Sequence, residues 1–492
     1  MEETTSGETS TNFSTERSDS HLSSFNISDI ENGSASDLER QIGFGAPQVL
    51  EEIRRAAPNP KKAETRLSVI LLDQGLFTVY KRLFITTFAL NVTALILAAT
   101  GHFPYAEKEA ALFSVGNILA LVLCRSEVFL RIVFWVAVKM LGRSWVPIPL
   151  KTAATSFLQC LGGIHSGCGI SSIMWLIYSL VQILRHREST SGVIIGVAAA
   201  ILGLLFISSA AAFPLVRHVH HNFFEEIHRF AGWIALALLW AFVILTASYN
   251  PTKRAYKLRF LDLVKKQDFI FTLLITLLII FPWLTVRKVA VQVSAQSGQA
   301  SLIKFGGGVN PGLLGRISRS PLSDWHAFGI ISDGKDEHMM LAGAVGDFTT
   351  GLVSDPPKFL YTRCIHFAGL PYLVNMYEKV VVVATGSGIG VFLSFMLQRS
   401  RANVYFIWVA KSIQRNFGDE IVRKIESYPS EKMIVHDTAV SGRPNVAELT
   451  VKAVRDWSAQ VVIVTSNPRG SRDVVKKCRG EGIPAFGPIW DS

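Results

Sequence analysis

Apolar residues gather in long runs in the first part of the chain and alternate with polar residues in the last part. Six apolar stretches lie at about 83–101, 112–124 (with an extension to 138), 153–184, 192–213, 228–248 and 268–285. About 20 consecutive apolar residues cross the hydrocarbon core of a bilayer. The pattern therefore predicts a polytopic α-helical membrane domain of about six transmembrane helices over 83–285.

The residues before the first apolar run have a different composition. Residues 1–66 are rich in charged and hydroxyl side chains, and 1–38 contain 15 Ser or Thr. Such a segment buries too little apolar surface to offset the entropy of ordering, so a disordered, Ser/Thr-rich cytosolic tail is expected. Residues 67–82 are amphipathic and predict an interfacial helix.

Beyond residue 286 the hydrophobic pattern has the short period of β-strands. The stretch VRKVAVQVSAQSGQASLIKF predicts two strands with a turn at Ser297-Gly298, and short strands continue to about 365. This indicates a small β-barrel over 286–376. From 377 to 492, strand-like and helix-like runs alternate, which is typical of an α/β domain with a parallel sheet.

A glycine-rich turn follows the most apolar strand of the α/β part. Val380–Val383 precede Thr385-Gly386-Ser387-Gly388-Ile389-Gly390. Such a turn lets the backbone approach a pyrophosphate, and the following helix presents its N-terminus to the anion. A seventh membrane span is the alternative, because 380–397 carries almost no charge. The flanking α/β pattern favours a nucleotide-binding strand, turn and helix.

Two short motifs in the β part offer an aromatic ring and a second glycine turn. They are Trp325-His326-Ala327-Phe328-Gly329-Ile330 and Gly346-Asp347-Phe348-Thr349. An aromatic ring, a histidine donor and a glycine-threonine turn are suited to a flavin ring and its phosphates. Taken alone, the first motif is more often an ordinary strand.

Composition narrows the classes of function. The chain of 492 residues is 49% hydrophobic and 18% charged, with a mean hydropathy of +0.33. Five cysteines without a Cys-x-x-Cys pair argue against a disulfide framework and a structural zinc site. The net charge of +11 lies outside the acidic tail and suits loops that meet anionic lipid. No basic helix with interleaved aromatics is present, so nucleic acid is not an expected partner.

Taken together, the order and spacing of these motifs resemble those of the ferric reductase and NADPH oxidase superfamily. The string SRSPLSDWHAFGI and the end AFGPIWDS look most like the fungal TmpA-type integral membrane flavoproteins. The resemblance implies a six-helix membrane domain, an FAD-binding barrel and a C-terminal NAD(P)H-binding domain, as in ferredoxin reductases. It also implies a multi-pass protein, expected in the plasma membrane, with both termini in the cytosol.

The resemblance carries roles for individual residues. His326 and Phe328 would contact the flavin, and Gly346 and Thr349 would lie beside its pyrophosphate. The residues expected at NAD(P)H are Gly386, Gly388 and Gly390. Four departures from the family pattern are Ala327, Gly329, Phe392-Leu393 and Thr465-Ser466-Asn467-Pro468.

Two further pairs of residues complete the candidate sites. Lys411 and Arg415 follow a predicted strand and would hold a 2′-phosphate, which favours NADPH; a solvated helix face is an equal alternative. By the resemblance, His165 and His228 are the expected metal ligands, on either side of one inner b-type haem. No catalytic residue is assigned.

The predicted function is a membrane flavoprotein oxidoreductase that passes electrons from NAD(P)H through FAD, and through one haem, to an unidentified acceptor. Ala327, Phe392, Thr465 and the absence of a second pair of membrane histidines support an alternative, a catalytically degenerate regulatory or sensor flavoprotein in fungal developmental signalling. A transporter or channel is the third interpretation, and the spans lack the paired charges that would support it.

Overall fold

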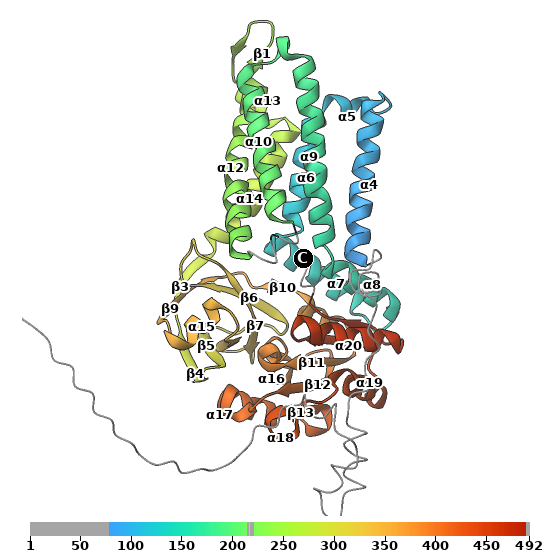
Figure 1. Ribbon diagram of the computed structural model, residues 1–492, viewed down its shortest axis with the longest axis vertical. Coiled ribbons are helices and arrows are strands. Elements are labelled where there is room, and N and C mark those ends of the chain that lie inside the picture. Colours follow the sequence, from blue (N-terminus) through green and yellow to red (C-terminus); the bar gives the residue numbers. More distant parts are fainter. Residues whose placement is uncertain (1–77, 214–215, 217–220, 489–492) are drawn as a thin grey trace, which may run out of the picture. The chain divides into compact units, whose positions relative to one another are not determined.

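The computed structural model describes residues 78–213, 216 and 221–488, which all belong to one compact unit, Leu76–Ser492 (Figure 1). The predicted tail, and residues 67–77 of the predicted interfacial helix, lie outside the described residues. Residues 79–82 belong to the first described helix, α4.

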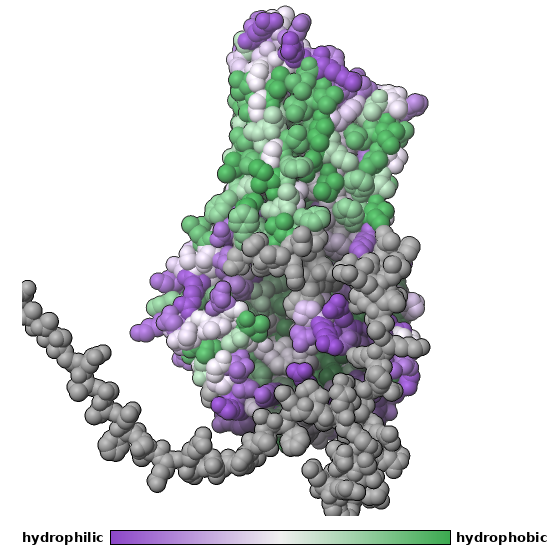
Figure 2. Space-filling model, viewed as in Figure 1, coloured by the Kyte–Doolittle hydropathy of each residue, from purple (hydrophilic) through white to green (hydrophobic). Residues whose placement is uncertain are grey.

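The first half of the described chain is helical. Its helices are α4 (Val79–Ala99), α5 (Pro104–Lys108), α6 (Ala110–Leu123), α7 (Glu127–Leu141), α8 (Ile148–Gln159), α9 (Gly162–Arg185), η2 (Arg187–Ser189), α10 (Gly192–Ala211), α12 (His221–Ser248), α13 (Phe260–Val264) and α14 (Gln267–Leu284). The short strands β1 (Tyr249–Asn250) and β2 (Ala255–Tyr256) pair between α12 and α13. Figure 2 shows apolar residues covering the visible face of this part.

Within the described residues, five helices rather than six are long and apolar enough to cross a membrane: α4, α9, α10, α12 from Phe223, and α14. The apolar run expected at 112–124 forms α6, which has only 14 residues. Its predicted extension to 138 is wrong, because Ser126 caps a new helix, α7, by accepting a hydrogen bond from Phe129 N. The run 153–184 is likewise divided, between α8 and α9.

Helices α7 and α8 pack against the sheets. Phe134 of α7 and Leu158 of α8 are buried in the same hydrophobic core as strands of both sheets. An apolar face that contacts protein rather than lipid needs only one helical stripe, so a charge such as Lys139 of α7 can lie exposed on another side of the helix.

A buried polar cluster joins α4, α6 and α9. Asn91 Oδ1 accepts hydrogen bonds from Asn117 Nδ2 at 2.8 Å and from Trp175 Nε1 at 2.9 Å. Trp175 is fully buried. Polar groups among apolar helices need partners nearby, so this cluster fixes the register of the three helices.

A curled antiparallel sheet follows the helices. Its order is β3-β9-β6-β7-β8-β5-β4, and β10 pairs with β6. The strands are β3 (Val286–Ala290), β4 (Gln292–Ser297), β5 (Ala300–Gly306), β6 (Leu313–Ser318), β7 (His326–Ser332), β8 (Glu337–Gly343), β9 (Phe359–Arg363) and β10 (Phe367–Ala368). β4 and β5 form the hairpin predicted around Ser297-Gly298. Helix α15 (Asp347–Ser354) follows β8.

The last part is a five-stranded parallel sheet with the order β13-β12-β11-β14-β15. Its strands are β11 (Lys379–Thr385), β12 (Asn403–Ala410), β13 (Met433–Asp437), β14 (Val461–Thr465) and β15 (Ala485–Phe486). The connecting helices are η3 (Leu370–Met376), η4 (Gly386–Val391), α16 (Ser394–Leu397), α17 (Ile413–Glu426), η5 (Ser430–Lys432), α18 (Thr438–Ser441), α19 (Val446–Trp457) and α20 (Pro468–Gly480). The alternative of a seventh span at 380–397 is therefore excluded, because β11 hydrogen-bonds to strands on both sides.

Both faces of this sheet are buried, so its central strands are apolar without interruption. Val380 and Val382 of β11 face one core, which includes η4 and α17. Val381 and Val383 face the other, which includes α19 and α20. Strand β11 is thus the central strand of the α/β part. The residues after it lie at the carboxyl end of the strand, between the elements that cover the two faces of the sheet.

Candidate functional site

The strand order reverses at β11, and the carboxyl ends of β11, β12 and β14 define the edge that we call the crevice. The chain leaves β11 toward β12 on one side, while β14 flanks β11 on the other. Ligands of open parallel sheets bind at this reversal of strand order, outside the carboxyl ends of the strands. Residues 385–391 and 465–467 lie at that edge.

The three glycines after β11 have three different environments. Gly386 has a φ of +55°, which favours glycine, and a Cβ there would meet nothing within 4 Å. A Cβ on Gly388 would lie 2.7 Å from Thr465 O, and one on Gly390 would lie 3.2 Å from Leu341 Cβ. Gly388 and Gly390 therefore allow close packing against β14 and β8. Only Gly386 leaves its backbone open to a ligand.

Gly386 is held by its neighbours. Trp408 Nε1 donates a 2.9 Å hydrogen bond to Gly386 O, and the hydroxyls of Thr385 and Ser466 are 2.7 Å apart across the ends of β11 and β14. Trp408 is almost fully buried. The turn is thus positioned by the core, and the Thr385–Ser466 pair places two hydroxyls at the crevice.

The helix expected after the glycine turn is reduced to a 3-10 segment, η4, and the four-residue α16. The prediction that a helix N-terminus faces an anion at this turn is therefore wrong. Residues 389–393 pack against β7 and β8 instead, and a Cβ on Gly329 of β7 would lie 2.4 Å from Val391 Cα. Contact with the antiparallel sheet takes the place of a longer helix.

Lys411 and Arg415 lie at the carboxyl end of β12, beside the crevice. Both side chains are exposed, and neither makes an ion pair with any residue that the structure describes. Ser412 between them adopts a left-handed conformation with a φ of 50°. The turn brings two cations to the edge where a 2′-phosphate binds in dinucleotide folds.

Asp437, at the end of β13, fixes this turn. Its carboxylate accepts hydrogen bonds from Ser412 N, Ile413 N and Ala439 N at 2.7–2.8 Å. Burial alone raises the pKa of Asp437, but the three backbone donors outweigh it and hold the pKa below its ordinary value. Sequence reasoning missed Asp437, although an aspartate ending a strand before a helix is a common capping residue.

The aromatic motif of the β part lies in a group of neighbouring rings, which we call the aromatic wall. The rings of His326 and Phe348 stack with centroids 4.0 Å apart, and Phe328 lies 6.4 Å from Phe348. Val345, in the loop just before α15, is 93% exposed, and a Cβ on Gly343 at the end of β8 would lie 2.5 Å from Ser387 Oγ. The predicted flavin and nucleotide motifs therefore approach each other, although about 60 residues separate them.

Thr349 bonds to its own turn. Its hydroxyl accepts from Val345 N and Gly346 N, both at 3.1 Å, and donates to Gly346 O at 3.0 Å. These two backbone donors are consequently occupied. Gly346 and Thr349 build the turn before α15, and Phe348 is held by it against His326.

His165 and His228 lie together, as the sequence predicted for a pair on two helices. Their ring centroids are 6.4 Å apart. His165 Nδ1 lies 2.9 Å from Leu121 O, and His228 Nδ1 lies 2.6 Å from Ser208 Oγ. Neither ring forms a hydrogen bond through Nε2 with a residue in the described ranges. Within the described residues, no group of three or more metal-binding side chains is found.

An ion-pair cluster between α7 and the antiparallel sheet was not predicted. Glu127 is 7% exposed, and its Oε1 accepts from Arg363 Nη1 at 2.8 Å and contacts Arg316 Nε at 2.5 Å. The Arg363 guanidinium also lies 4.7 Å from the ring of Trp325. No sequence spacing links residue 127 to residue 363, so only the fold reveals the pair.

Comparison with known proteins points to a family different from the expected one. Residues 370–492 match the family model described as adenylate-forming reductase 03009, C-terminal domain. Two relatives from Coprinopsis cinerea are adenylate-forming reductase 06235, 31% identical over 95% of this chain and 44% of the relative, and adenylate-forming reductase 03009, 32% identical over 88% and 42%. The chain thus spans less than half the length of the curated relatives that it matches.

The chain is also similar to parts of solved reductases. These include ferredoxin-NADP+ reductase from Plasmodium falciparum with 2′P-AMP (TM-score 0.30, 9% identity, 41% of this chain and 94% of that chain) and the cytochrome b5 reductase domain of Ulva prolifera nitrate reductase (TM-score 0.31, 9%, 41% and 97%). Because these TM-scores are below 0.5, the likenesses assign neither a cofactor nor an activity to the chain.

The predicted membership of the ferric reductase and NADPH oxidase superfamily, and of its TmpA-type branch, is therefore wrong, since the relatives are named adenylate-forming reductases. The predicted function as a ferric-reductase-like membrane flavoprotein, and its degenerate sensor alternative, are corrected on the same ground. The names of the relatives mention neither a membrane, nor FAD, nor ferric iron.

Proposed function

We propose that this chain is the nucleotide-dependent reductase part of an adenylate-forming reductase. The observation that carries the proposal is the crevice at the carboxyl end of β11, which lies inside residues 370–492, the segment that the family model matches. We assign reduction to this chain, with NADPH as reductant. We assign adenylate formation to the part of the relatives that this chain does not match.

The residues of the crevice suit two parts of NADPH, its pyrophosphate and its 2′-phosphate. The open backbone at Gly386 and the hydroxyls of Thr385 and Ser466 suit the pyrophosphate, which accepts hydrogen bonds only. Lys411 and Arg415 suit the 2′-phosphate, where a guanidinium binds two oxygens at once. NADPH supplies hydride chemistry, and the chain supplies its orientation.

Flavin is the second cofactor that we propose. The rings of His326 and Phe348 stack, Phe328 lies next to Phe348, and such an aromatic group fits a planar ring system. The turn at Gly346 and Thr349 fits a pyrophosphate less well, because Thr349 already occupies its donors. A flavin supplies hydride and single-electron chemistry, and the aromatic wall would orient its ring.

For localisation we propose a multi-pass membrane protein, expected in the plasma membrane. Five long apolar helices with exposed apolar side chains support this placement. Helix α6 packs closely with α9 at the centre of the helical part and would make the sixth crossing, which puts both ends of the chain on the cytosolic side. The domains then follow the predicted boundaries: the membrane part over 83–285, the antiparallel part over 286–376 and the nucleotide-binding part over 377–492.

His165 and His228 are proposed as a pair of metal ligands. Each ring has its Nδ1 within hydrogen-bond distance of an oxygen, which orients Nε2 in the manner common for metal-binding imidazoles. No comparison supports a haem at this pair. A visible spectrum of the purified chain, with His165→Ala and His228→Ala as paired variants, tests metal binding; loss of one band in both supports it, and a colourless wild type refutes a haem.

Calorimetric titration of the purified full chain with NADPH tests the proposed function. We expect one site per chain in the wild type and at least tenfold weaker binding in Gly386→Val, because valine is strained at a positive φ and covers the open backbone. Gly482→Val is the matched control, since Gly482 has a φ of +74°, has open surroundings and lies just before β15, at the amino end of that strand. Equal binding by Gly386→Val and wild type contradicts the assignment.

A further inference from the structure

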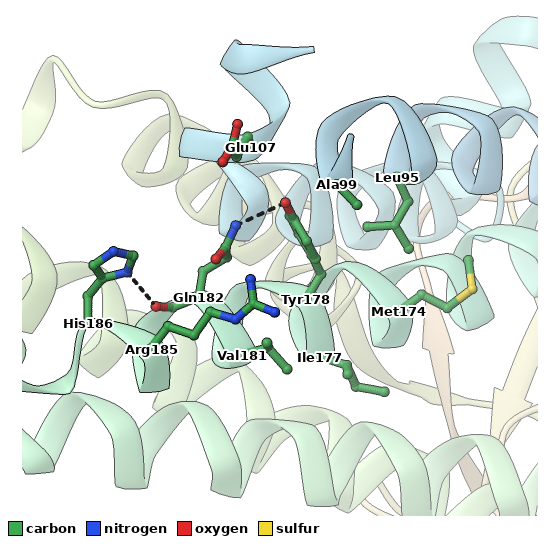
Figure 3. Close-up of a pocket in the computed structure, with 10 residues that line it drawn as sticks. All are labelled: Leu95, Ala99, Glu107, Met174, Ile177, Tyr178, Val181, Gln182, Arg185 and His186. Carbon is green, nitrogen blue, oxygen red and sulfur yellow. Dashed lines mark hydrogen bonds between the residues drawn. The ribbon is translucent and has the colours of Figure 1, made fainter. Parts of the chain in front are cut away.

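A cavity of about 620 Å³ lies between α4, α5 and α9, at the helix ends formed by Ala99 and Arg185 (Figure 3). The α9 residues that line it recur every three or four positions, at 174, 177, 178, 181, 182 and 185, and so share one face of the helix. At 1.5 Å per residue this face is about 16 Å long. The cavity is therefore elongated along α9.

The wall of the cavity changes from apolar to charged along this face. Leu95, Met174, Ile177 and Val181 make its apolar part. Towards the end of α9, Gln182 Nε2 donates to the hydroxyl of Tyr178 at 3.0 Å, which leaves the tyrosine O–H free to donate into the cavity. His186 Nδ1 lies 3.0 Å from Gln182 O, so this ring is anchored to the helix end (Figure 3).

Two opposite charges line the cavity without pairing. Arg185 ends α9, and Glu107 belongs to α5 on another wall (Figure 3). Neither side chain makes an ion pair or a hydrogen bond with any residue in the described ranges, and the two are not joined to each other. Both side chains are exposed, and a ligand that contacts both would carry an anionic group and a cationic group.

We propose that this cavity binds a zwitterionic phospholipid with a primary amine in its headgroup. The phosphate lies on Arg185 and Tyr178, the ammonium on Glu107, and an acyl chain on the apolar wall. Arginine binds phosphate oxygens in pairs, which makes this the strongest contact. A fatty acid is the poorer occupant, because its single carboxylate leaves Glu107 unpaired next to a like charge. The site is separate from the nucleotide crevice and does not depend on the proposed reductase function.

Native mass spectrometry of the delipidated full chain in detergent tests this inference. The probes are dioctanoyl phosphatidylethanolamine, dioctanoyl phosphatidic acid, which lacks the amine, and octanoate. We expect one bound phosphatidylethanolamine per chain, held at least tenfold more tightly than either other probe. The proposal is wrong if octanoate binds as tightly as dioctanoyl phosphatidylethanolamine, or if phosphatidylethanolamine shows no saturable binding.

Single substitutions test the roles of Arg185 and Glu107 separately. Arg185→Gln is expected to weaken phosphatidylethanolamine and phosphatidic acid about tenfold alike, whereas Glu107→Gln removes the preference for phosphatidylethanolamine and leaves phosphatidic acid bound. Arg187→Gln and Glu109→Gln are the matched controls, because these neighbours do not line the cavity. Ala99→Phe narrows the cavity between α4 and α9 and is expected to abolish binding with helix content unchanged. Unchanged binding in either Arg185→Gln or Glu107→Gln refutes the assignment of that charge and with it the zwitterionic ligand.

Discussion

Replacing Glu127 by glutamine is expected to destabilise the junction between α7 and the antiparallel sheet. Glu127 is 7% exposed and pairs with Arg316 and Arg363. Burial lowers the pKa of Arg363, and Glu127 opposes that shift. The carboxylate compensates the partly desolvated positive charges of Arg316 and Arg363, and glutamine would remove this counter-charge from both guanidinium groups.

The expected loss in the free energy of unfolding depends on how exposed Arg316 and Arg363 are. Removing one partner of a buried ion pair costs about 3–5 kcal/mol. The Arg363 side chain is 13% exposed, but the Arg316 side chain is 33% exposed and partly solvated, so the lower end applies. A loss of about 3 kcal/mol lowers the unfolding temperature by roughly 6–12 °C for a domain of 150–250 residues.

Thermal unfolding in detergent, followed by tryptophan fluorescence, measures this loss. Trp325 and Trp283 lie 4.7 and 5.9 Å from the Arg363 guanidinium and report on the junction. Glu109→Gln is the control, because Glu109 is exposed and lies at the start of α6. Adding Arg363→Met to Glu127→Gln is expected to restore at least half of the loss, because it removes an unpaired charge. A shift below 2 °C, or no recovery in the double variant, refutes the reasoning.

Three further predictions concern the crevice and one partly buried histidine, His366. Gly388→Ala should cost about 1–3 kcal/mol, since its methyl group would lie 2.7 Å from Thr465 O; chemical unfolding measures it, with the open Gly480→Ala as control. Lys411→Gln and Arg415→Gln should each weaken NADPH about tenfold and leave NADH unchanged in calorimetry; equal losses for both nucleotides would place these cations elsewhere. Burial, with His338 and Arg131 nearby, lowers the pKa of His366 from 6.5 to about 4. The unfolded state takes up this proton first, so up to roughly 3 kcal/mol of stability, complete above pH 6.5, is lost as the pH falls toward 4. The unfolding temperature should therefore fall over this range in the wild type and less in His366→Gln, and parallel profiles would exclude His366 as the cause.

The sequence predicted the elements whose signal is local. The run Val380–Val383 and the alternation after residue 286 have the strand period, and both form strands. The run at 112–124 forms α6, but its extension to 138 is wrong, because Glu127 begins a separate helix and pairs with Arg316 and Arg363, about 190 and 236 positions away. The helix after Gly386 was overpredicted, because contact with β7 and β8 replaces it.

The sequence identified residues that lie at the candidate site, but it did not predict the contacts that these residues make. His326 stacks on Phe348, a contact that was not predicted, Thr349 bonds to its own turn, and Gly388 packs on β14. None of these outcomes follows from spacing, since they depend on which strands become neighbours. The family was misassigned because short motifs of glycine and aromatic residues recur among unrelated reductases, and only similarity over most of the chain distinguishes them.

Hydrogen–deuterium exchange of the full chain, with and without saturating NADPH, is the decisive measurement for the nucleotide crevice. We predict slower exchange in peptides covering 385–391, 411–416 and 465–470, which border the crevice at the end of β11. Peptides of β4 and β5, which lie in the other sheet, serve as the internal reference. Protection confined to other segments, or none at a nucleotide concentration that saturates binding, would contradict the assignment of this crevice as the NADPH site.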